Sequence, residues 1–489
     1  MTSSLPTLLS RFAHLDVVVV GDALLDVYLD GHATKLCREA PVPVVEVDER
    51  VDVPGGAGNV AMNLAALGAT STLVSLVGED DAGAVLRRRL TEGGVDVSRL
   101  VVDDSRETVS LQRVTAGSQV LVRVDTGSEA PPAPVVTSRL VDAVTQSCRS
   151  ADAVIVSDYG RGVLQDDVVA ALQEVRVRRD LVLTVDSRHP QTFRHLAPTA
   201  AKPNWSETVA LLGTGELDGI DERAAGIAQH GDRILELTGA RIVAVTLDAE
   251  GAMVFERGRP PHRTYARPAN DAQATGSGDT FVAALTLALA SGADTPTAAE
   301  IASAAANAVV RQPGTVTCTV DRLREQFSEP GKVVGVDGLP ELAAEYHAAG
   351  RRVVFTNGCF DILHRGHITY LNRSKTLGDV LVVGVNDDDS VRTLKGPDRP
   401  INRLEDRVEV LAALSCVDHI VPFSAPTPTD VITTLRPDVY TKGGDYTMEA
   451  LPEARVVEAY GGEVQILPLM EDRSTTGLIA RIREDALHG

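Results

Sequence analysis

The stretch ATGSGDTFVAALTLALA at residues 274–290 joins a glycine-rich turn directly to an apolar helix. Gly276, Ser277 and Gly278 leave the backbone free to approach a ligand, and the start of the helix offers unpaired N–H groups and a partial positive charge. Phosphate groups bind at such helix starts. Asp279 lies at the same place, where a carboxylate can accept the proton of an attacking hydroxyl. The stretch therefore predicts a phosphoryl-transfer site, with a plain helix cap as the alternative.

Around this segment, short branched-apolar runs that end in Gly, Asp or Asn alternate with helical patterns. Near-continuous apolar strands are typical of sheets covered on both faces, so the pattern predicts α/β architecture with largely parallel sheets. Ligands then bind outside the carboxyl ends of the strands. The expected strands are 15–22, 72–80, 151–158, 181–187, 241–248, 351–358, 379–387 and 438–445, and clear helical patterns cover 59–69, 166–179 and 279–292.

Two stretches depart from this alternation. Residues 41–54 (PVPVVEVDERVDVP) alternate in polarity and contain Pro, which predicts exposed antiparallel strands, such as a small β lid over a site. Residues 325–340 are rich in Pro, Gly and charge after a helical run, which predicts a domain boundary. The expected organisation is a first domain at 1–328, a linker and connecting helix at 329–350, and a second domain at 351–489.

Bulk composition excludes several classes of protein. A length of 489 residues predicts two or three domains, and a net charge of −21 argues against nucleic-acid binding. The five cysteines are dispersed and odd in number, which favours reduced thiols in a cytoplasmic protein. Neither a signal peptide nor a membrane-spanning run of about 20 apolar residues is expected.

Three further motifs extend the first predicted site. GGAGNVAMNLAALG at 55–68 is a second glycine-rich turn, in which Gly55 and Gly56 let a sugar lie against backbone and Asn59 can hydrogen-bond its hydroxyls. Asp22 and Asp26 form a GDxxxD pattern that suits a polyol. KPNWSE at 202–207 supplies Asn204 and Glu207, which can act on Mg²⁺ through water.

In this order, and with SDYGRG at 157–162, the motifs make the first domain resemble the ribokinase-like (PfkB) sugar kinases. The resemblance implies ATP, Mg²⁺ held through Glu207, a sugar hydroxyl as nucleophile and Asp279 as catalytic base. Gln273 stands where relatives carry an Asp that helps to hold a monovalent cation, which argues against potassium activation unless Asp271 compensates. The nucleotide contacts that the resemblance to these kinases implies are Asn204, Ser206, Glu207, Thr246, Gly251, Gly276, Ser277 and Gly278.

A phosphorylated sugar would need cations in this acidic chain. Four cations, Lys35, Arg38, Arg113 and Arg123, flank the predicted lid and sugar site, and we expect some of them to hold the sugar's phosphate. Ordinary solvated surface charge is the alternative for each.

The second predicted site lies in FTNGCFDILHRGHITYLNRSK at 355–375. A strand ends at Asn357–Gly358, a turn holds Phe360 and Asp361, and a helix begins near His364. His364 and His367 are three residues apart and share one face of the first turn. Two imidazoles there can contact nucleotide phosphates and stabilise the charge of leaving pyrophosphate. A metal pair is the alternative, but no third ligand stands at a convincing spacing.

Residues farther along the chain join this second site. RSTTGLIARI at 473–482 places hydroxyls at a helix start that can bind a phosphate. With its HxGH and STT signatures, the block 351–489 resembles the cytidylyltransferase-like nucleotidyltransferases, and the chemistry implied is in-line attack of a substrate phosphate on the α-phosphorus of a nucleoside triphosphate. The additional residues expected at the nucleotide are Lys395, Arg407, Lys442, Ser474, Thr475 and Thr476.

Five motifs extend the likeness over the chain: EAPVPVVEV at 39–47, VPGGAGN at 53–59, TNGCFDILHRGH at 356–367, LKGPDRPIN at 394–402 and TKGGDY at 441–446. Taken end to end, the chain resembles the bifunctional heptose 7-phosphate kinase/heptose 1-phosphate adenylyltransferases. That resemblance implies ATP at both sites and a separate phosphatase between the two reactions. Base choice does not follow from the motifs, so a kinase for another sugar phosphate joined to a CTP-using transferase is the alternative. A non-catalytic nucleotide sensor is a second alternative, which the presence of Asp279, His364 and His367 disfavours. The lid strands favour a homodimer, because exposed strand edges tend to be covered.

Overall fold

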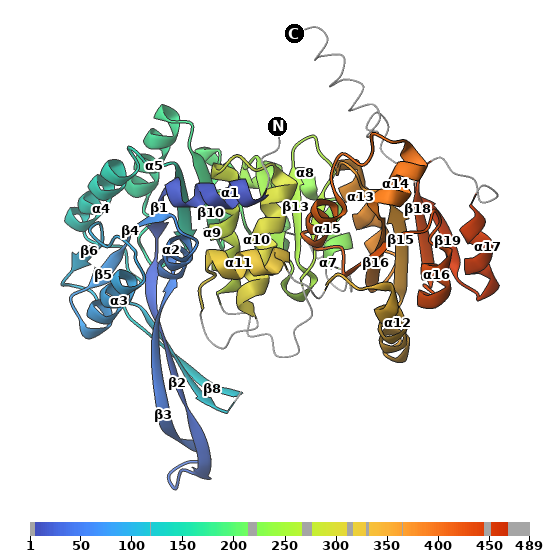
Figure 1. Ribbon diagram of the computed structural model, residues 1–489. Coiled ribbons are helices and arrows are strands. Elements are labelled where there is room, and N and C mark those ends of the chain that lie inside the picture. Colours follow the sequence, from blue (N-terminus) through green and yellow to red (C-terminus); the bar gives the residue numbers. More distant parts are fainter. Residues whose placement is uncertain are drawn as a thin grey trace. The chain divides into compact units, whose positions relative to one another are not determined.

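The computed structural model describes residues 5–117, 119–213, 223–266, 276–310, 316–328, 332–363, 365–444 and 451–467. The chain divides into two compact units, Met1–Leu323 and Arg324–Gly489 (Figure 1). We call them unit 1 and unit 2 and describe each by itself. The domain boundary predicted after residue 328 stays a prediction.

Unit 1 is built on an eight-stranded sheet in the order β14-β13-β12-β11-β10-β9-β1-β4. The strands from β12 to β4 run parallel, and β13 and β14 continue the sheet antiparallel. The predicted apolar runs form buried strands here, which confirms the α/β class. The strands are β1 (Asp16–Gly21), β4 (Thr70–Val74), β9 (Ala153–Asp158), β10 (Val182–Ser187), β11 (Ala200–Ala201), β12 (Ile242–Thr246), β13 (Ala252–Glu256) and β14 (His262–Thr264).

Helices cover both faces of this sheet. Helices α4 (Pro134–Ser147) and α5 (Asp166–Arg178) pack on the face that carries Leu183 and Val185. Helix α9 (Ser277–Ala290) lies on the other face, where Thr286 donates a hydrogen bond to Thr184. The remaining helices are α1 (Leu5–Arg11), η1 (Phe12–His14), α2 (Ala57–Ala66), α3 (Asp81–Glu92), η2 (Pro190–Leu196), α6 (Trp205–Leu212), α7 (Arg223–Ala228), α8 (Gly231–Thr238), η4 (Asp248–Glu250), α10 (Thr295–Val310) and, continuing to residue 328, α11 (Val320–Ser328).

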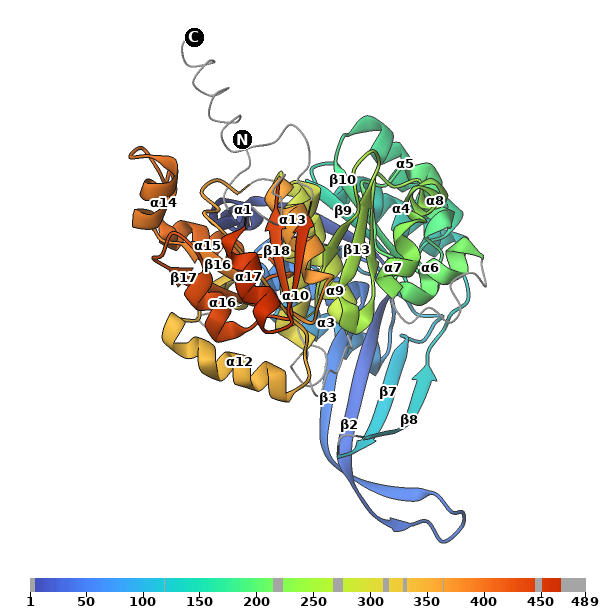
Figure 2. The same ribbon diagram turned by 90° about the vertical axis from the view of Figure 1, so that its right-hand side faces the viewer.

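The predicted lid is a four-stranded sheet in the order β3-β2-β7-β8. The long strand β2 (Ala23–Leu36) pairs antiparallel with β3 (Pro43–Gly56) and parallel with β7 (Ser110–Ala116), which pairs antiparallel with β8 (Gln119–Thr126). Figure 2 shows these strands projecting from the α/β body of unit 1. The prediction of antiparallel strands at 41–54 is confirmed, whereas β2 itself was not predicted. A separate pair, β5 (Leu76–Gly78) and β6 (Val101–Asp103), runs parallel.

Unit 2 contains a fully parallel sheet in the order β17-β16-β15-β18-β19. The strand order reverses between β15 and β18, and ligands bind at such a switch point in open α/β sheets. The strands are β15 (Val353–Gly358), β16 (Val380–Asn386), β17 (His419–Phe423), β18 (Val439–Gly443) and β19 (Glu463–Leu467). The helices are η6 (Val336–Gly338), α12 (Leu339–Ala348), α13 (Arg365–Lys375), α14 (Asp388–Lys395), α15 (Leu404–Ala412), α16 (Thr429–Leu435) and α17 (Pro452–Ala459).

The connecting segment before residue 351 is part of unit 2. Leu339 is fully buried in the core of this unit, with Ala343 beside it. Upstream, Val333 forms a parallel bridge with Ile420, and Lys332 donates to the carbonyls of Ala412 and Leu414. In the part of the chain that the structure describes, no helix is both long and apolar enough to cross a membrane.

Candidate active sites

The first site centres on Asp279, in the first turn of α9. Gly276 precedes this helix with a φ of 84°, a left-handed conformation that favours glycine. Asp279 is only 7% exposed, so its carboxylate lies inside the protein at the start of the helix. The predicted turn therefore has the geometry of an anion-binding helix start with an acid beside it.

Two side chains from distant segments hold this carboxylate. Asn59, at the start of α2, donates from Nδ2 to Oδ2 of Asp279 at 2.7 Å, and the Tyr159 hydroxyl donates to Oδ1 at 2.7 Å. Burial raises the pKa of Asp279 above its ordinary value, while these two donors and the charge of Lys202 act in the opposite direction. The site is therefore built for a carboxylate that accepts a proton more readily than one in water.

Asp22 is held by backbone donors, and its predicted contact with a sugar stays a prediction. Its carboxylate accepts hydrogen bonds from the backbone N–H groups of Tyr159, Arg161 and Val163, at 2.9–3.0 Å. These bonds fix the loop that presents Tyr159 to Asp279. Asp22 thus supports the site through the loop.

The two glycines before Asn59 lie in crowded backbone. Gly56 has a φ of 57°, and a Cβ there would come within 2.5 Å of the Asp22 carbonyl oxygen. A Cβ on Gly55 would come within 2.3 Å of Oδ2 of Asp26. The small residues therefore let the turn pass close to the two acids of the GDxxxD pattern.

The predicted lid cations separate into two groups. Arg113 forms an ion pair with buried Asp26, and Arg123 lies opposite Arg113 across the β7–β8 ladder. Lys35 is nine residues beyond Asp26 on β2, roughly 30 Å along the strand at ~3.3 Å per residue, and pairs with exposed Glu46. Arg113 and Arg123 thus share the face of the lid that carries Asp26, and Lys35 lies away from it.

The nucleotide residues predicted from KPNWSE form a reciprocal helix cap. The Asn204 side chain accepts from the Glu207 N–H at 2.9 Å, and the Glu207 carboxylate accepts from the Asn204 N–H at 2.8 Å. Ser206 is exposed on the same helix. Thr246 ends β12 and forms a bridge with Asn204, and Gly251 turns the chain into β13 with a φ of 92°. These residues lie beside neighbouring strand ends. The reciprocal cap uses the side-chain oxygen of Asn204 and one carboxylate oxygen of Glu207.

Sequence reasoning missed Tyr159, Lys202 and Asp186. Lys202 and Asp186 form a buried ion pair of 3.0 Å beside Asp279. A signal was available for the lysine, because it opens the KPNWSE motif in a chain with six lysines among 47 basic residues. Gln273 and Asp271 lie outside the described residues.

The second site lies at the switch point of unit 2. Asn357 ends β15, and its Oδ1 accepts hydrogen bonds from Nζ of Lys442 and from the Tyr440 hydroxyl, both at 2.9 Å. Burial lowers the pKa of Lys442. Two predicted nucleotide residues, Asn357 and Lys442, are therefore adjacent where a parallel sheet of this order binds ligands.

The turn after β15 is held by Asp361. This buried carboxylate accepts from the N–H groups of Ile401 and Asn402 and forms an ion pair with Arg399. Phe360 has a φ of 46°, a strained conformation for a non-glycine residue. Its ring edge contacts the His367 ring, with centroids 5.5 Å apart. The turn thus packs against the helix that carries His367.

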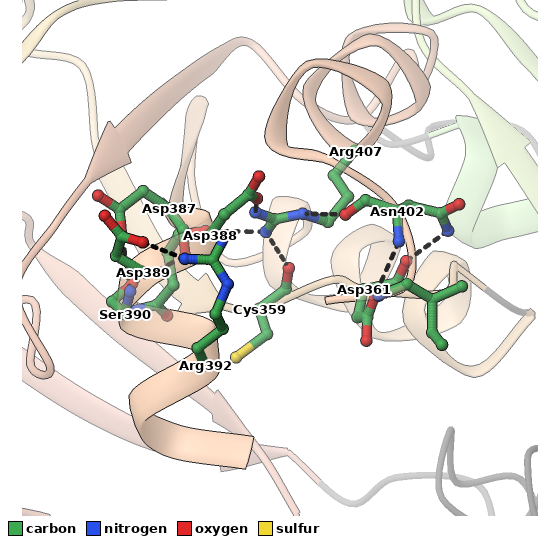
Figure 3. A network of polar contacts seen from close by, with 11 residues as sticks. Cys359, Asp361, Asp387, Asp388, Asp389, Ser390, Arg392, Asn402 and Arg407 are labelled. Atoms are coloured by element: carbon green, nitrogen blue, oxygen red, sulfur yellow. Dashed lines mark hydrogen bonds and ion pairs between the residues drawn. The ribbon is translucent and has the colours of Figure 1, made fainter. Parts of the chain in front are cut away.

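Arg407 makes structural contacts within unit 2, and its predicted contact with the nucleotide stays a prediction. Its side chain is 1% exposed and donates to the carbonyls of Asn402, Cys359 and Asn386 and to the Asp388 carboxylate (Figure 3). All three guanidinium nitrogens are used in these bonds. Direct contact with a nucleotide would require breaking them.

Helix α13 is anchored to the sheet by buried hydroxyls. The Thr356 and Tyr370 hydroxyls are 2.5 Å apart, and Ser374 and Thr441 bond at 2.9 Å. Lys395 is exposed at the end of α14. Its charge acts on Cys359, where it opposes the larger effect of burial, which raises the pKa of that thiol. Gly358 ends β15 beside the Phe360 ring. His364, Ser474, Thr475 and Thr476 lie outside the described residues.

Comparisons with known proteins find a matching family for each of the two units. The model of the PfkB family of carbohydrate kinases matches residues 14–322, and the cytidylyltransferase-like model matches residues 355–474. Among solved structures, phosphofructokinase-2 from Escherichia coli has a TM-score of 0.54 at 20% identity, covering 64% of this chain and 97% of that chain. Ribokinase from Arabidopsis thaliana has a TM-score of 0.50 at 20% identity and covers 64% of this chain and 98% of that one. These likenesses establish the ribokinase-like fold.

Fold and sites together define an enzyme that joins a carbohydrate kinase to a nucleotidyltransferase. Bifunctional protein HldE of Geobacter sulfurreducens is 39% identical over 483 residues, 97% of each chain. HldE of Pseudomonas aeruginosa PAO1 is 40% identical over 479 residues, 97% of this chain and 98% of its own. The chain belongs to the HldE family of bifunctional proteins.

Proposed function

We propose that unit 1 phosphorylates heptose 7-phosphate at C1 with ATP, giving heptose 1,7-bisphosphate. After a separate phosphatase has removed the 7-phosphate, unit 2 transfers AMP from ATP to heptose 1-phosphate, giving ADP-heptose and pyrophosphate. The observation that carries the proposal is the buried Asp279 carboxylate, aligned by Asn59 and Tyr159 at a glycine-led helix start. The end-to-end likeness to HldE proteins supports the choice of sugar.

In the kinase reaction, the C1 hydroxyl oxygen bonds to the γ-phosphorus of ATP. The bond from that phosphorus to the β–γ bridging oxygen breaks, ADP leaves and the hydroxyl proton passes to Asp279. The acid is suited to this step because burial favours its protonated product state. Asn59 and Tyr159 orient the accepting oxygens, and the N–H groups at the start of α9 face the phosphoryl oxygens.

Glu207 is the acid of this site that we expect to act on a divalent cation, because no group of three His, Cys, Asp or Glu side chains among the described residues is placed to hold a metal ion directly. Its charge also acts on the neighbouring Lys202. Hard oxygen ligands suit Mg²⁺, which usually keeps several waters and binds the phosphates of its nucleotide. Glu207, one oxygen of which caps α6, would hold such an ion through water. When bound, Mg²⁺ offsets the negative charge of the ATP phosphates.

In unit 2, a phosphate oxygen of heptose 1-phosphate attacks the α-phosphorus of ATP, and pyrophosphate leaves. Lys442 and His367 supply positive charge or hydrogen-bond donors beside the switch point, and Asn357 orients Lys442. His364, Ser474, Thr475 and Thr476 complete the predicted phosphate contacts. No covalent intermediate with the protein is needed.

The direct test is to incubate the protein with ATP and heptose 7-phosphate, with and without a bisphosphate phosphatase, and to weigh the products. The bisphosphate is expected without the phosphatase, and ADP-heptose only with it. Equal turnover of CTP and ATP with heptose 1-phosphate would contradict the adenylyltransferase assignment. Absence of the bisphosphate would contradict the kinase assignment.

The lid cations give the first mutational prediction. Arg123→Ala is expected to raise KM for heptose 7-phosphate by about 10- to 100-fold, because a hydrogen bond to a charged group contributes ~1.5–3 kcal/mol. Arg113→Ala is expected to act in the same direction, with an added cost from leaving buried Asp26 unpaired. Steady-state kinetics measure both.

KM for the unphosphorylated heptose should not change in Arg123→Ala, since the interaction is with the phosphate. Arg88→Ala, at an exposed arginine of α3, is the matched control. An unchanged KM for heptose 7-phosphate in both lid variants would remove this role.

A homodimer through the lid is the second part of the proposal. Residues opposite one another in a ladder share a face, so Asp26, Tyr28 and Arg113 lie on one face of the lid and Val122 and Val124 on the other. Val122 and Val124 are 49% and 45% exposed on edge strand β8. The face with Asp26 and Arg113 is thus directed to substrate, and the exposed valines of β8 on the other face are left for a second copy.

Val122→Glu is expected to convert the dimer to a monomer in light-scattering measurements, because a charge replaces apolar area at the contact. Val177→Glu, at an exposed valine of α5, is the control and should leave the mass unchanged. A wild-type monomer, or a dimer that survives Val122→Glu, would rule out this interface.

A further inference from the structure

The ion pair of Asp186 and Lys202 is fixed by the register of two neighbouring strands. Val185 pairs with Ala201 across the parallel ladder of β10 and β11, so Asp186 and Lys202 follow at adjacent strand ends. The Lys202 N–H donates to the Val185 carbonyl at 2.9 Å, and its Nζ lies 3.0 Å from Oδ1 of Asp186. Lys202 is 6% exposed and Asp186 is 8% exposed. The backbone therefore leaves the ammonium little freedom to move.

The Lys202 ammonium points toward the anion-binding turn. A Cβ on Gly278 would lie 3.3 Å from Nζ, so the ammonium sits against the first turn of α9, one residue from Asp279. Burial alone would lower the pKa of Lys202, but the charges of Asp186, Glu207 and Asp279 together raise it. Three acids thus share one lysine where a polyphosphate has to enter.

We propose that Lys202 is a further catalytic residue of the kinase half, contacting the phosphoryl group in transfer, and that Asp186 is the positioning residue that holds it there. This inference rests on the proposed function of the site. The N–H groups of α9 approach the phosphoryl oxygens from the helix start, and Lys202 approaches from the strand ends. Negative charge on those oxygens is therefore met from two sides.

The reaction assigns each group one task. As the sugar oxygen bonds to the γ-phosphorus and the bridging oxygen departs with ADP, the proton goes to Asp279 and the equatorial oxygens keep their charge. Lys202 stays protonated throughout and stabilises that charge. A preorganised donor in a buried site has this effect without reorganisation during the reaction.

A purely structural role explains the pair less well. Buried ion pairs often add no net stability compared with apolar residues of similar volume, so stability alone does not account for one beside the base. Arginine is the usual cation in this chain, and Lys35 and Lys202 are the two lysines before residue 324. A lysine offers a compact point charge where a guanidinium would need more room.

The test compares Lys202→Met, Lys202→Arg and Asp186→Asn with the wild type in the kinase assay of the full-length chain. Lys202→Met is expected to lower kcat by about 10²- to 10³-fold, with KM for the sugar phosphate nearly unchanged. Lys202→Arg should recover part of that loss, and Asp186→Asn should lower kcat by less than Lys202→Met. Asp180→Asn, at an exposed acid just before β10, is the matched control and should retain wild-type kcat.

The pH profile separates catalysis from folding. Because the charge of Lys202 lowers the pKa of Asp279, Lys202→Met should move the acid limb of kcat/KM to higher pH, and Lys202→Arg should restore it. A fold defect would lower the amount of active enzyme without moving the limb. Circular dichroism gives the folded fraction of each variant.

Two results would overturn the role of Lys202. One is a wild-type kcat in Lys202→Met. The other is a loss of kcat equal to the unfolded fraction of this variant, with the acid limb of kcat/KM at its wild-type pH. Wild-type kcat in Asp186→Asn would overturn the positioning role. The wild type could fail on heptose 7-phosphate but phosphorylate another sugar phosphate from a panel. The proposed substrate would then be wrong, and comparing the Lys202 and Asp186 variants on that other sugar would still test the role of Lys202. If the wild type phosphorylates none of the panel, both the proposed function and the role of Lys202 are wrong.

Discussion

Replacing Asp279 with Asn is expected to lower kcat of the kinase reaction by about 10³-fold, within the range for loss of a general base. The amide keeps the shape of the carboxylate, and its groups can still pair with Asn59 and Tyr159, because the tyrosine hydroxyl can turn and accept. The lost function is then proton acceptance alone. Adenylyl transfer by the same molecules should be unchanged, which makes unit 2 an internal control for protein concentration.

The same variant should show a pH-dependent gain in stability. The pKa of Asp279 in the folded protein lies above its ordinary value. The stability linked to the protonated acid is therefore fully present below the ordinary pKa. It is lost as the pH rises through the folded-state pKa. Asn carries no charge and avoids this loss. Thermal unfolding should therefore favour Asp279→Asn at neutral pH, with the advantage shrinking as the solution is acidified.

Asp180→Asn is the matched control for both measurements, because that acid is fully exposed at the surface. Retention of more than a tenth of wild-type kcat by Asp279→Asn would contradict the role of Asp279 as base. Loss of adenylyl transfer in parallel would indicate a general folding defect instead.

Arg407→Leu is expected to destabilise unit 2 by about 3–5 kcal/mol, the range seen when one partner of a buried ion pair is removed. Three carbonyl groups and Asp388 would lose their donor together (Figure 3). Adenylyl transfer should then be lost at a lower temperature than in the wild type, whereas kinase activity should survive to the same temperature. Heating aliquots and assaying both reactions measures this difference.

Arg392→Leu is the control for Arg407→Leu. Arg392 lies in the same neighbourhood but is half exposed and pairs with exposed Asp389 (Figure 3). Little change in stability is expected there. A raised KM for ATP in Arg407→Leu, with thermal stability intact, would contradict the structural role and restore the predicted contact with the nucleotide.

The fold was predictable from sequence because its signals are local. Apolar runs ending in Gly, Asp or Asn identified the buried parallel strands, and the glycine-led start of α9 identified the anion-binding turn that carries Asp279. Asn59 and Asp279 are 220 residues apart, and neither segment alone indicates that the two side chains meet. Only the resemblance of the ordered motifs placed both in one site.

The remaining residues show what the sequence alone does not indicate. Sequence indicates that Asp22 and Arg407 carry charge near a site, but not which neighbours use their hydrogen-bonding groups. In the structure, backbone donors occupy the Asp22 carboxylate and backbone acceptors occupy the Arg407 guanidinium. Tyr159 and Lys202 were missed for the opposite reason, since each lies in a recognised motif whose geometry depends on strand register.

The placement of the segment from Lys332 to Ala348 has a practical consequence for separating the two activities by protein engineering. Its buried Leu339 and its bridge to Ile420 make it part of the folding unit of the transferase. A gene fragment that starts at residue 351 would omit these contacts and uncover apolar surface, so it should yield insoluble protein. A fragment that starts between α11 and Lys332 retains them and is the sensible choice for expression.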